Sequence, residues 1–279
     1  MLRYRSVVAP WLAAFGMCLT LALAFAATPA PSPSVVQLRQ KVVAFAGGAG
    51  ALDKVRTLSF DFVSVDPKTR TRAVHHHTYD REKGVWKYEI SLADFAKTPF
   101  WNKAAGDRWA PDPNVPKGKR LVAIFDHYPR LQGTVYIDGK PQTDAENARL
   151  LRRVNDSIDN DRYWMFLPLL IENQAVRLDP APPVEEGKYG KLQGFTAYSG
   201  QNKAENRTLW TLYVTPKGEL VRTDVMVLHN PAPVVVLWEK WKQLGPVRIA
   251  LEHAIPKMNR SLPFERVVIN EPVNTEPPH

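Results

Sequence analysis

The sequence predicts a mainly β protein with helices (α+β), in which a curled antiparallel sheet or incomplete β-barrel carries a helical lid. Three observations predict this class. Short segments alternate apolar and polar residues, as Trp86, Tyr88 and Ile90 do with Lys87 and Glu89. The connections between them have hairpin length, which excludes parallel βαβ units. One helical pattern divides the series, and a meander of about nine to eleven strands must curl, close or stack to bury a face.

Residues 1–26 have the three parts of a secretory signal peptide. Arg3 and Arg5 supply its positive charge, an apolar stretch follows, and Ala24-Phe25-Ala26 places small residues at the −3 and −1 positions of a cleavage site. We therefore expect an exported, periplasmic protein that is cleaved before about Ala27. The alternative is an uncleaved membrane anchor, because the apolar stretch approaches the length that spans a bilayer.

Cys18 is the only cysteine, so the exported chain would have neither a disulfide nor a reactive thiol. Lipidation at Cys18 is disfavoured, because Phe15-Gly16-Met17 is not the Leu-small-small run that precedes a lipidated cysteine. Stability must then come from a hydrophobic core. The remaining chain is long enough for one large domain, which we expect at 34–273 after a Pro-rich linker at 27–33.

The formal net charge is +9, or +7 without Arg3 and Arg5. The lysines and arginines are scattered along the chain, so a solvated surface explains them, and a transient contact with anionic membrane lipids is the alternative. We expect no nucleic acid partner, because an exported protein rarely meets one.

The first half of the domain begins with a short helix. Ser34 caps it, Val36, Leu38 and Val42 lie on its apolar side, and Gly47-Gly48 ends it. Strand patterns then occupy residues 58–65, 69–79, 85–92, 120–128 and 133–137. Between them, residues 93–119 mix aromatic residues with prolines, and we interpret them as an insertion over the sheet, partly helical at its start.

The central helix is predicted from Thr143, because Thr143 and Glu146 fit a capping box. Leu151, Val154 and Ile158 continue it at helical spacing. Asp159 and Asp161 are interpreted as residues that end it, and Pro168 predicts that the chain continues in an extended conformation.

Residues 163–171 form an apolar block without a charge or an amide. Such a block must be buried on all sides or must line an apolar cavity. Its position after a capped helix, between two sets of hairpins, favours the lip of a cavity over a plug of the core.

The second half returns to strands after a loop at 180–183. The strand patterns occupy residues 190–198, 209–214, 220–228, 234–242, 247–254 and 264–270. The tail at 274–279 is expected to be loose.

His75-His76-His77 is the most conspicuous candidate metal site. On a strand, His75 and His77 share a face and could reach one ion. Local spacing supplies no third ligand, and Arg70 and Arg72 disfavour a cation. We therefore interpret this segment as an exposed strand face and predict neither a metal nor a cofactor.

No catalytic constellation stands out, and we expect a protein that is not an enzyme. A secreted hydrolase is disfavoured because the chain has no Gly-x-Ser-x-Gly motif. Asp159 and Asp161 lack the glycine and the closing glutamate of a calcium loop. The glycines at 47–50 are not followed by the Lys-Ser/Thr pair of a phosphate-binding loop.

Over about residues 36–270 the layout resembles the exported outer-membrane lipoprotein-sorting and lipoprotein-carrier superfamily (LolA/LolB-like). The resembling segments are Ala46-Gly47-Gly48 and Leu52–Leu58, Trp164–Leu170 after a central helix, the Leu212-Tyr213-Val214 and Leu220-Val221 hairpin, and the Trp238–Trp241 strand. The resemblance implies an incomplete β-barrel around an apolar cavity lidded by helices, with acyl chains bound without covalent chemistry. No polar residue that lines the cavity of those carriers can be matched here, and this chain is longer.

We therefore predict an exported, non-enzymatic carrier for a lipid, a lipoprotein acyl chain or another apolar ligand, held in the concave face of the half-barrel. An envelope structural or assembly scaffold with a filled core is the alternative, and an envelope protein partner would suit either function. The candidate cavity and lid residues are Trp86, Tyr88, Trp164, Phe166, Leu167, Trp210 and Trp238.

Overall fold

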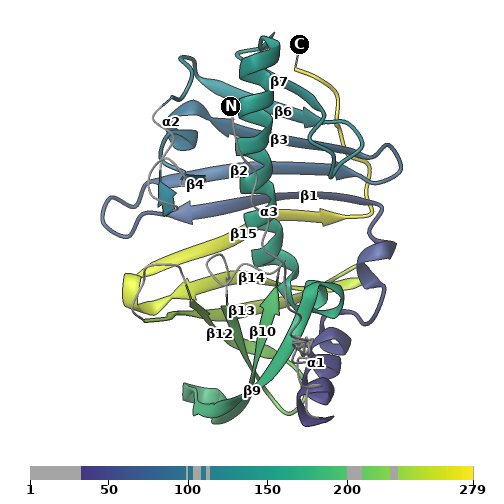
Figure 1. Ribbon diagram of the computed structural model, residues 1–279, viewed down its shortest axis with the longest axis vertical. Helices are drawn as coiled ribbons and strands as arrows, with labels where there is room; N and C mark the ends of the chain where they lie inside the picture. Colours follow the sequence, from purple (N-terminus) through teal and green to yellow (C-terminus); the bar gives the residue numbers. More distant parts are fainter. Residues whose placement is uncertain are drawn as a thin grey trace, which may run out of the picture. The chain divides into compact units, whose positions relative to one another are not determined.

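One antiparallel sheet of 13 strands dominates the computed structural model, and a long helix crosses its concave face (Figure 1). The structure describes residues 33–98, 100–102, 108–110, 114–199, 209–226 and 232–278. The predicted signal peptide at 1–26 and nearly all of the linker lie outside this range. Residues 31–279 make up one compact unit.

The strands of the first half are β1 (Thr57–Val65), β2 (Arg72–Asp80), β3 (Val85–Ser91), β6 (Arg120–Phe125), β7 (Gly133–Ile137) and β8 (Lys140–Pro141). Those of the second half are β9 (Ala175–Glu185), β10 (Lys191–Ser199), β11 (Leu209–Val214), β12 (Leu220–Met226), β13 (Val234–Leu244), β14 (Val247–Ile255) and β15 (Arg260–Ile269). Strand β3 buries Trp86, Tyr88 and Ile90 on one face, as its alternation predicts.

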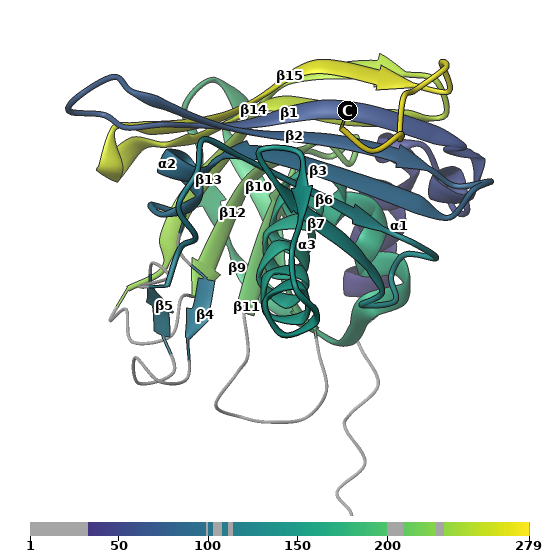
Figure 2. The same cartoon turned by 90° about the horizontal axis from the view of Figure 1, so that it is seen from above.

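The sheet runs in the order β8-β7-β6-β3-β2-β1-β15-β14-β13-β12-β11-β10-β9. Its two halves join through β1 and β15, where Leu58 pairs with Ile269 and Phe62 with Phe264. Strands β8 and β9 remain as free edges, so the sheet is curled but not closed (Figure 2). This confirms the predicted incomplete barrel of antiparallel strands.

Helix α3 (Asp144–Gln174) connects the two edge strands directly. Its 31 residues give a length of about 46 Å at 1.5 Å per residue. A flat sheet of 13 strands would measure about 58 Å across, so only a curled sheet brings its edges within reach of one helix. The helix contacts β6, β7, β9, β10 and β14, which belong to both halves of the sheet.

The prediction that the helix ends at Asp159 and Asp161 is wrong, and so is the prediction that the chain is extended after Pro168. Helix α3 continues through all three residues. A proline in a helix interior costs about 3 kcal/mol, because it removes one hydrogen bond and crowds the preceding turn. Burial of Phe166, Leu167 and their apolar neighbours at about 1.5–3 kcal/mol each outweighs that cost.

Helix α1 (Pro33–Ala46) packs on β9, β10 and β14 of the second half, and the short helix η1 (Ala51–Lys54) leads from it to β1. Helix α1 buries Val35, Val42 and Ala46, and it contacts α3. Gly47 follows with φ of 135°, and a side chain there would meet the Pro246 carbonyl oxygen at 2.5 Å.

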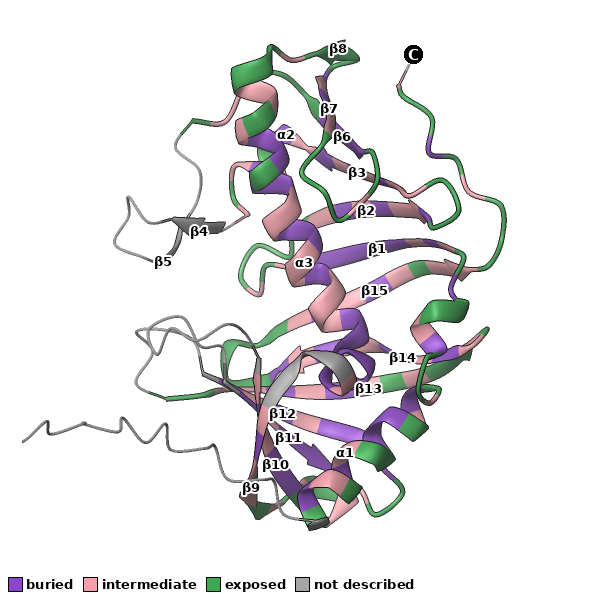
Figure 3. Ribbon diagram, turned by 45° about the vertical axis from the view of Figure 1, so that its right-hand side comes forward, coloured by how far each residue is buried: buried purple, intermediate pink, exposed green. Residues whose placement is uncertain are grey.

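The core lies between the concave face of the sheet and the buried side of α3, whose exposed residues are confined to its first turns (Figure 3). It is a single large cluster that includes residues from α1, α3 and both halves of the sheet. Most of the apolar block is part of it, since Met165, Leu167 and Leu169 are each less than 5% exposed.

Two regions differ from the sequence expectations. The insertion is helical at its start, as predicted, in α2 (Leu92–Phe95), and its described remainder includes the small pair β4 (Phe100–Asn102) and β5 (Arg108–Ala110). Residues 180–183, predicted as a loop, belong to β9. Prolines are tolerated there because β9 is an edge strand, on which an N–H can be lost without breaking a ladder.

None of the described helices combines the length and the hydropathy needed to cross a bilayer.

Candidate functional site

Two features lie where α3 passes over β1, β2 and β3. One is a partly open pocket, and the other is a buried cluster of two histidines and an aspartate. Trp86 belongs to both, because its ring lines the pocket and its indole N–H donates to His77.

The pocket has a volume of about 260 Å³. Its walls come from η1, from β1, β2 and β3, from the segment after β6, and from α3. Eight of its eleven lining residues are apolar or aromatic, and the other three are charged. The lining residues are Leu52, Asp53, Val55, Leu58, Tyr79, Arg81, Trp86, Tyr128, Pro129, Arg162 and Phe166.

Arg162 places a positive charge at the aromatic side of this pocket. Its Nη1 donates to the Tyr128 hydroxyl at 2.9 Å and lies 3.4 Å from the Asp159 carboxylate. The guanidinium is 5.7 Å from the centroid of Trp86 and 5.4 Å from that of Tyr128, within cation–π range. Burial raises the pKa of Tyr128, so its hydroxyl stays protonated and donates to Asp159.

A second arginine, Arg81, also lines the pocket. Arg81 donates to the Leu52 carbonyl and to the Asp53 carboxylate, both at 2.9 Å. The pocket is therefore mainly apolar and aromatic with two arginines in its lining, and each arginine has a carboxylate partner.

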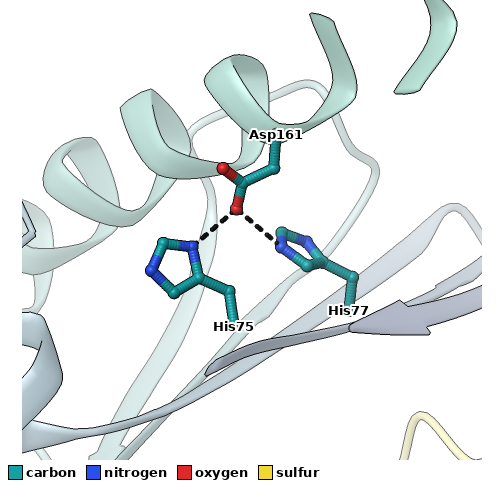
Figure 4. Close-up of side chains that lie close together, drawn as sticks. All are labelled: His75, His77 and Asp161. Carbon is teal, nitrogen blue, oxygen red and sulfur yellow. Dashed lines mark hydrogen bonds and ion pairs between the residues drawn. The ribbon is translucent and has the colours of Figure 1, made fainter. Parts of the chain in front are cut away.

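The second feature, the His75–His77–Asp161 cluster, is more deeply buried. His75, His77 and Asp161 are 4%, 1% and 0% exposed. Asp161 Oδ2 lies 2.7 Å from His75 Nδ1 and 2.9 Å from His77 Nε2 (Figure 4). The other carboxylate oxygen accepts a hydrogen bond from Asn160 at 2.9 Å.

Strand alternation explains why the two histidines face inward. His75 and His77 point toward α3, while His76 points to the other face of β2 and contacts Asp61 at 2.6 Å. The ring of His77 stacks on Phe60 of β1 at 4.3 Å between centroids. The prediction of an exposed strand face is therefore wrong for His75 and His77, because α3 covers that face.

The hydrogen bonds define the protonation of the cluster. The Trp86 indole N–H donates to His77 Nδ1 at 3.3 Å, so the proton of a neutral His77 is on Nε2 and is donated to Asp161. Burial lowers the pKa of His77, although Asp161 acts in the opposite direction. Burial alone would raise the pKa of Asp161, but the charge and hydrogen bonds of His75 and His77 outweigh it and lower that pKa to about 2.

His75 has a further partner at its outer nitrogen. His75 Nε2 lies 3.3 Å from Thr98 Oγ1, and that hydroxyl donates to the Asp94 carbonyl at 3.0 Å. The Thr98 carbonyl in turn accepts from Arg153 of α3. The segment after α2 is thus connected to the cluster and to the long helix by hydrogen bonds.

The cluster contains a donor set that can bind a metal ion. One atom from each of His75, His77 and Asp161 lies within 4.8 Å of the others. Two imidazole nitrogens and one carboxylate oxygen on one side of an ion are a known arrangement for transition metals. Among the described residues this is the group with such a donor set.

The predicted cavity and lid residues fall into three sets. Trp86 and Phe166 line the pocket. Tyr88, Leu167 and Trp238 are at most 2% exposed in the core, outside the pocket lining. Trp164 and Trp210 contact each other at 5.4 Å, and Trp164 also packs on His253 of β14.

Several residues of the two features were not predicted from the sequence. Arg162 and Tyr128 are the main polar residues of the pocket, and they are separated by a strand pair and half of a helix. Asp161 is the third member of the cluster, 84 residues from His77. The available signal was helical spacing, since Asp161 lies three residues after the buried Ile158 and four before the buried Met165, and so shares their face of the helix.

Comparison with solved structures shows a distant structural likeness. A DUF1329 family protein from Desulfovibrio piger aligns with a TM-score of 0.42 and 9% sequence identity, over 86% of this chain and 95% of that chain. No protein-family profile matches the chain, and no curated protein matches it. A likeness this distant carries no argument about ligands, so the function is argued from the residues of this chain.

Proposed function

We propose that the protein is an exported, non-enzymatic carrier that binds an apolar or amphipathic ligand in the pocket between α3 and the first half of the sheet. The observation that supports it is the aromatic interior of this pocket beside Arg162. Ligand sites are commonly apolar concavities with a few polar groups that orient the ligand. The resemblance to lipoprotein carriers of the LolA/LolB-like type agrees with this function.

The pocket size limits what it can take. Its volume of about 260 Å³ is near the lower end of the roughly 300–1,000 Å³ that small-molecule sites occupy. One acyl chain end, or a compact apolar molecule, suits it better than a whole lipid. Each methylene buried there would contribute about 0.8 kcal/mol, and Arg162 could pair with a carboxylate or phosphate head group.

The proposed ligands are therefore a lipid or the acyl chain of a lipoprotein. A carrier of this kind would receive its ligand and deliver it at the cell envelope. The contact would be made with an envelope protein or, transiently, with anionic lipid. The scattered positive charge of the chain would favour the second contact.

The test is to fill the pocket with a side chain. Leu52 lines the pocket and is partly buried, so Leu52→Trp adds bulk there. We expect this variant to weaken binding of a dansyl-labelled fatty acid at least tenfold, measured by fluorescence titration, with little change in melting temperature. Leu244→Trp in β13 is the matched control, because Leu244 is also partly buried but does not line the pocket.

Lipid mass spectrometry of protein purified from its native envelope gives an independent measurement. We expect an apolar molecule to co-purify in about equal amount with the protein. The carrier function is excluded if nothing co-purifies and the dansyl probe shows no saturable binding to the wild-type protein.

A scaffold with a filled core is the second candidate function. It is favoured by the burial of Tyr88, Leu167 and Trp238, three of the predicted cavity residues, between the sheet and α3. The same titration separates the two functions, since a scaffold predicts no saturable ligand binding and no effect of Leu52→Trp beyond stability.

A further inference from the structure

We propose that His75, His77 and Asp161 form a binding site for one divalent ion of the Zn²⁺ class. The proposed carrier function needs no metal, so the two proposals are independent. The observation behind the site is a buried set of two imidazole nitrogens and one carboxylate oxygen that comes from two elements far apart in the sequence.

The donor atoms are close to the separation that an ion would impose. Zinc binds nitrogen and oxygen ligands tetrahedrally at about 2.0–2.2 Å, which places ligand atoms about 3.3–3.6 Å apart. Asp161 Oδ2 is now 2.7 Å from His75 Nδ1 and 2.9 Å from His77 Nε2, and all three donor atoms lie within 4.8 Å. Small side-chain movements would open the two hydrogen bonds enough to admit the ion.

The chemistry of the donors selects the metal. Imidazole and carboxylate together suit Zn²⁺, Co²⁺, Ni²⁺ and Fe²⁺, whereas Ca²⁺ and Mg²⁺ prefer sites made of oxygen ligands. Copper(I) prefers sulfur, and no sulfur belongs to the donor set. The ion would take the place of the hydrogen in the two contacts with Asp161, each histidine would keep one proton on its other ring nitrogen, and Asp161 would supply the negative charge.

Neighbouring polar groups form hydrogen-bond contacts that would hold two of the three ligands, His75 and Asp161, in place. A metal-bound histidine usually donates its other N–H to an acceptor, and His75 Nε2 faces the Thr98 hydroxyl in this way. Asn160 holds the second oxygen of Asp161. The buried Tyr88 hydroxyl lies near Asp161 and Ser157 without a well-formed hydrogen bond among the described residues, which leaves a further oxygen beside the site.

The third ligand, His77, is contacted by the Trp86 indole N–H, and this contact would oppose metal binding. Its removal therefore gives a test that is specific to this site. Metal binding through Nε2 moves the remaining proton of His77 to Nδ1, where the Trp86 indole N–H now donates at 3.3 Å. Two donors would then face each other. Trp86→Phe removes the opposing donor, so we expect this variant to bind the metal about tenfold more tightly than the wild type.

The experiment uses full-length protein without a histidine tag, refolded with Co²⁺ or Zn²⁺ because the site is buried. We expect one equivalent of metal after gel filtration and a visible Co²⁺ spectrum that Zn²⁺ abolishes. His77→Gln and Asp161→Asn should each weaken binding at least 100-fold. His76→Gln is the matched control, because the adjacent His76 lies on the other face of β2 and should leave binding unchanged.

The result that overturns the site is wild-type protein that refolds to its native circular dichroism without retaining metal. Equal loss of binding in His76→Gln and His77→Gln would also overturn it, because it would mean surface chelation. If His77→Gln does not fold, Trp86→Phe decides, since it keeps all three ligands. Unchanged or weaker Co²⁺ binding by that variant overturns the assignment of His77 Nε2 as ligand.

Discussion

At the residue scale, Asp161 shows how a single charged side chain can join two distant elements. Its carboxylate is fully buried and accepts hydrogen bonds from His75, His77 and Asn160. A buried charge without partners would be strongly unfavourable, so the helix and β2 must meet here in one register. The alternation of β2 could predict that His75 and His77 share a face, but it could not show that a helix residue more than 80 positions later completes the cluster.

The burial of a second helix carboxylate, Asp156, is compensated less completely and should make stability depend on pH. Burial raises its pKa from 3.8 to about 6, with Arg153 opposing and Asp159 adding to the effect. Below about pH 4 the group is protonated in both the folded and the unfolded chain, so it costs nothing. Above about pH 6 it is ionised in both, and the folded protein carries the full cost of the buried charge.

Asp156→Asn removes this cost because an amide does not ionise. We expect the free energy of unfolding to rise by about 1 kcal/mol at pH 7.5, less than the full pKa difference implies, since the carboxylate is partly exposed to solvent. The gain should disappear at pH 3.5. Urea unfolding at the two pH values measures both quantities, and a gain of equal size at both would contradict the explanation.

At the element scale, α3 was only partly predictable. Its start follows from the capping residues and its helical spacing from Leu151, Val154 and Ile158. Its continuation through Pro168 could not be predicted, because local rules assign that residue to a helix end and only the tertiary burial of residues 165–171 reverses the outcome. The prolines of β9 were misinterpreted for a related reason, since edge position is a property of the sheet and not of the segment.

The β6–β7 hairpin depends on one glycine. Gly133 has φ of 153° and pairs with Phe125, and a side chain there would collide with the Ile124 carbonyl oxygen. We expect Gly133→Ala to lower the free energy of unfolding by about 3 kcal/mol, combining backbone strain with displacement of the hairpin. Thermal or urea unfolding measures the loss.

Gly187→Ala is the control for that prediction. Gly187 also has a positive φ, of 40°, but nothing lies within 4 Å of the position that its side chain would occupy. The control should cost about 1 kcal/mol from conformation alone. Equal losses for the two variants would show that the contact with Ile124 contributes nothing.

At the scale of the whole molecule, the architecture was predictable and the site was not. Hairpin-length connections and alternating faces specify an antiparallel sheet, and one central helix between two sets of strands specifies what covers it. The pocket combines Leu52, Tyr128 and Arg162 from three separate regions. No local pattern carries that information, because it depends on how far the sheet curls before α3 crosses it.

Strand β15 should be essential to the whole sheet. It pairs with both β1 and β14, and it is the element through which the two halves join. A chain ending at Ile255 would leave β1 and β14 as unpaired edges, and such edges pair with other chains. We expect this truncation to yield aggregated protein, whereas removal of residues 276–279 alone should leave soluble monomer, as measured by size-exclusion chromatography.

During synthesis of the chain, β1 is made long before its partner β15. Arg56 and Asn270, which hydrogen-bond beside this pair, are 214 residues apart. At about 5–20 residues per second of synthesis, roughly 10–40 seconds separate the appearance of the two residues. For that interval β1 has no partner on one side, and loop-closure entropy slows the pairing further once β15 is available. The chain is thus most exposed to misassociation before its last strand is made, however stable the finished protein is.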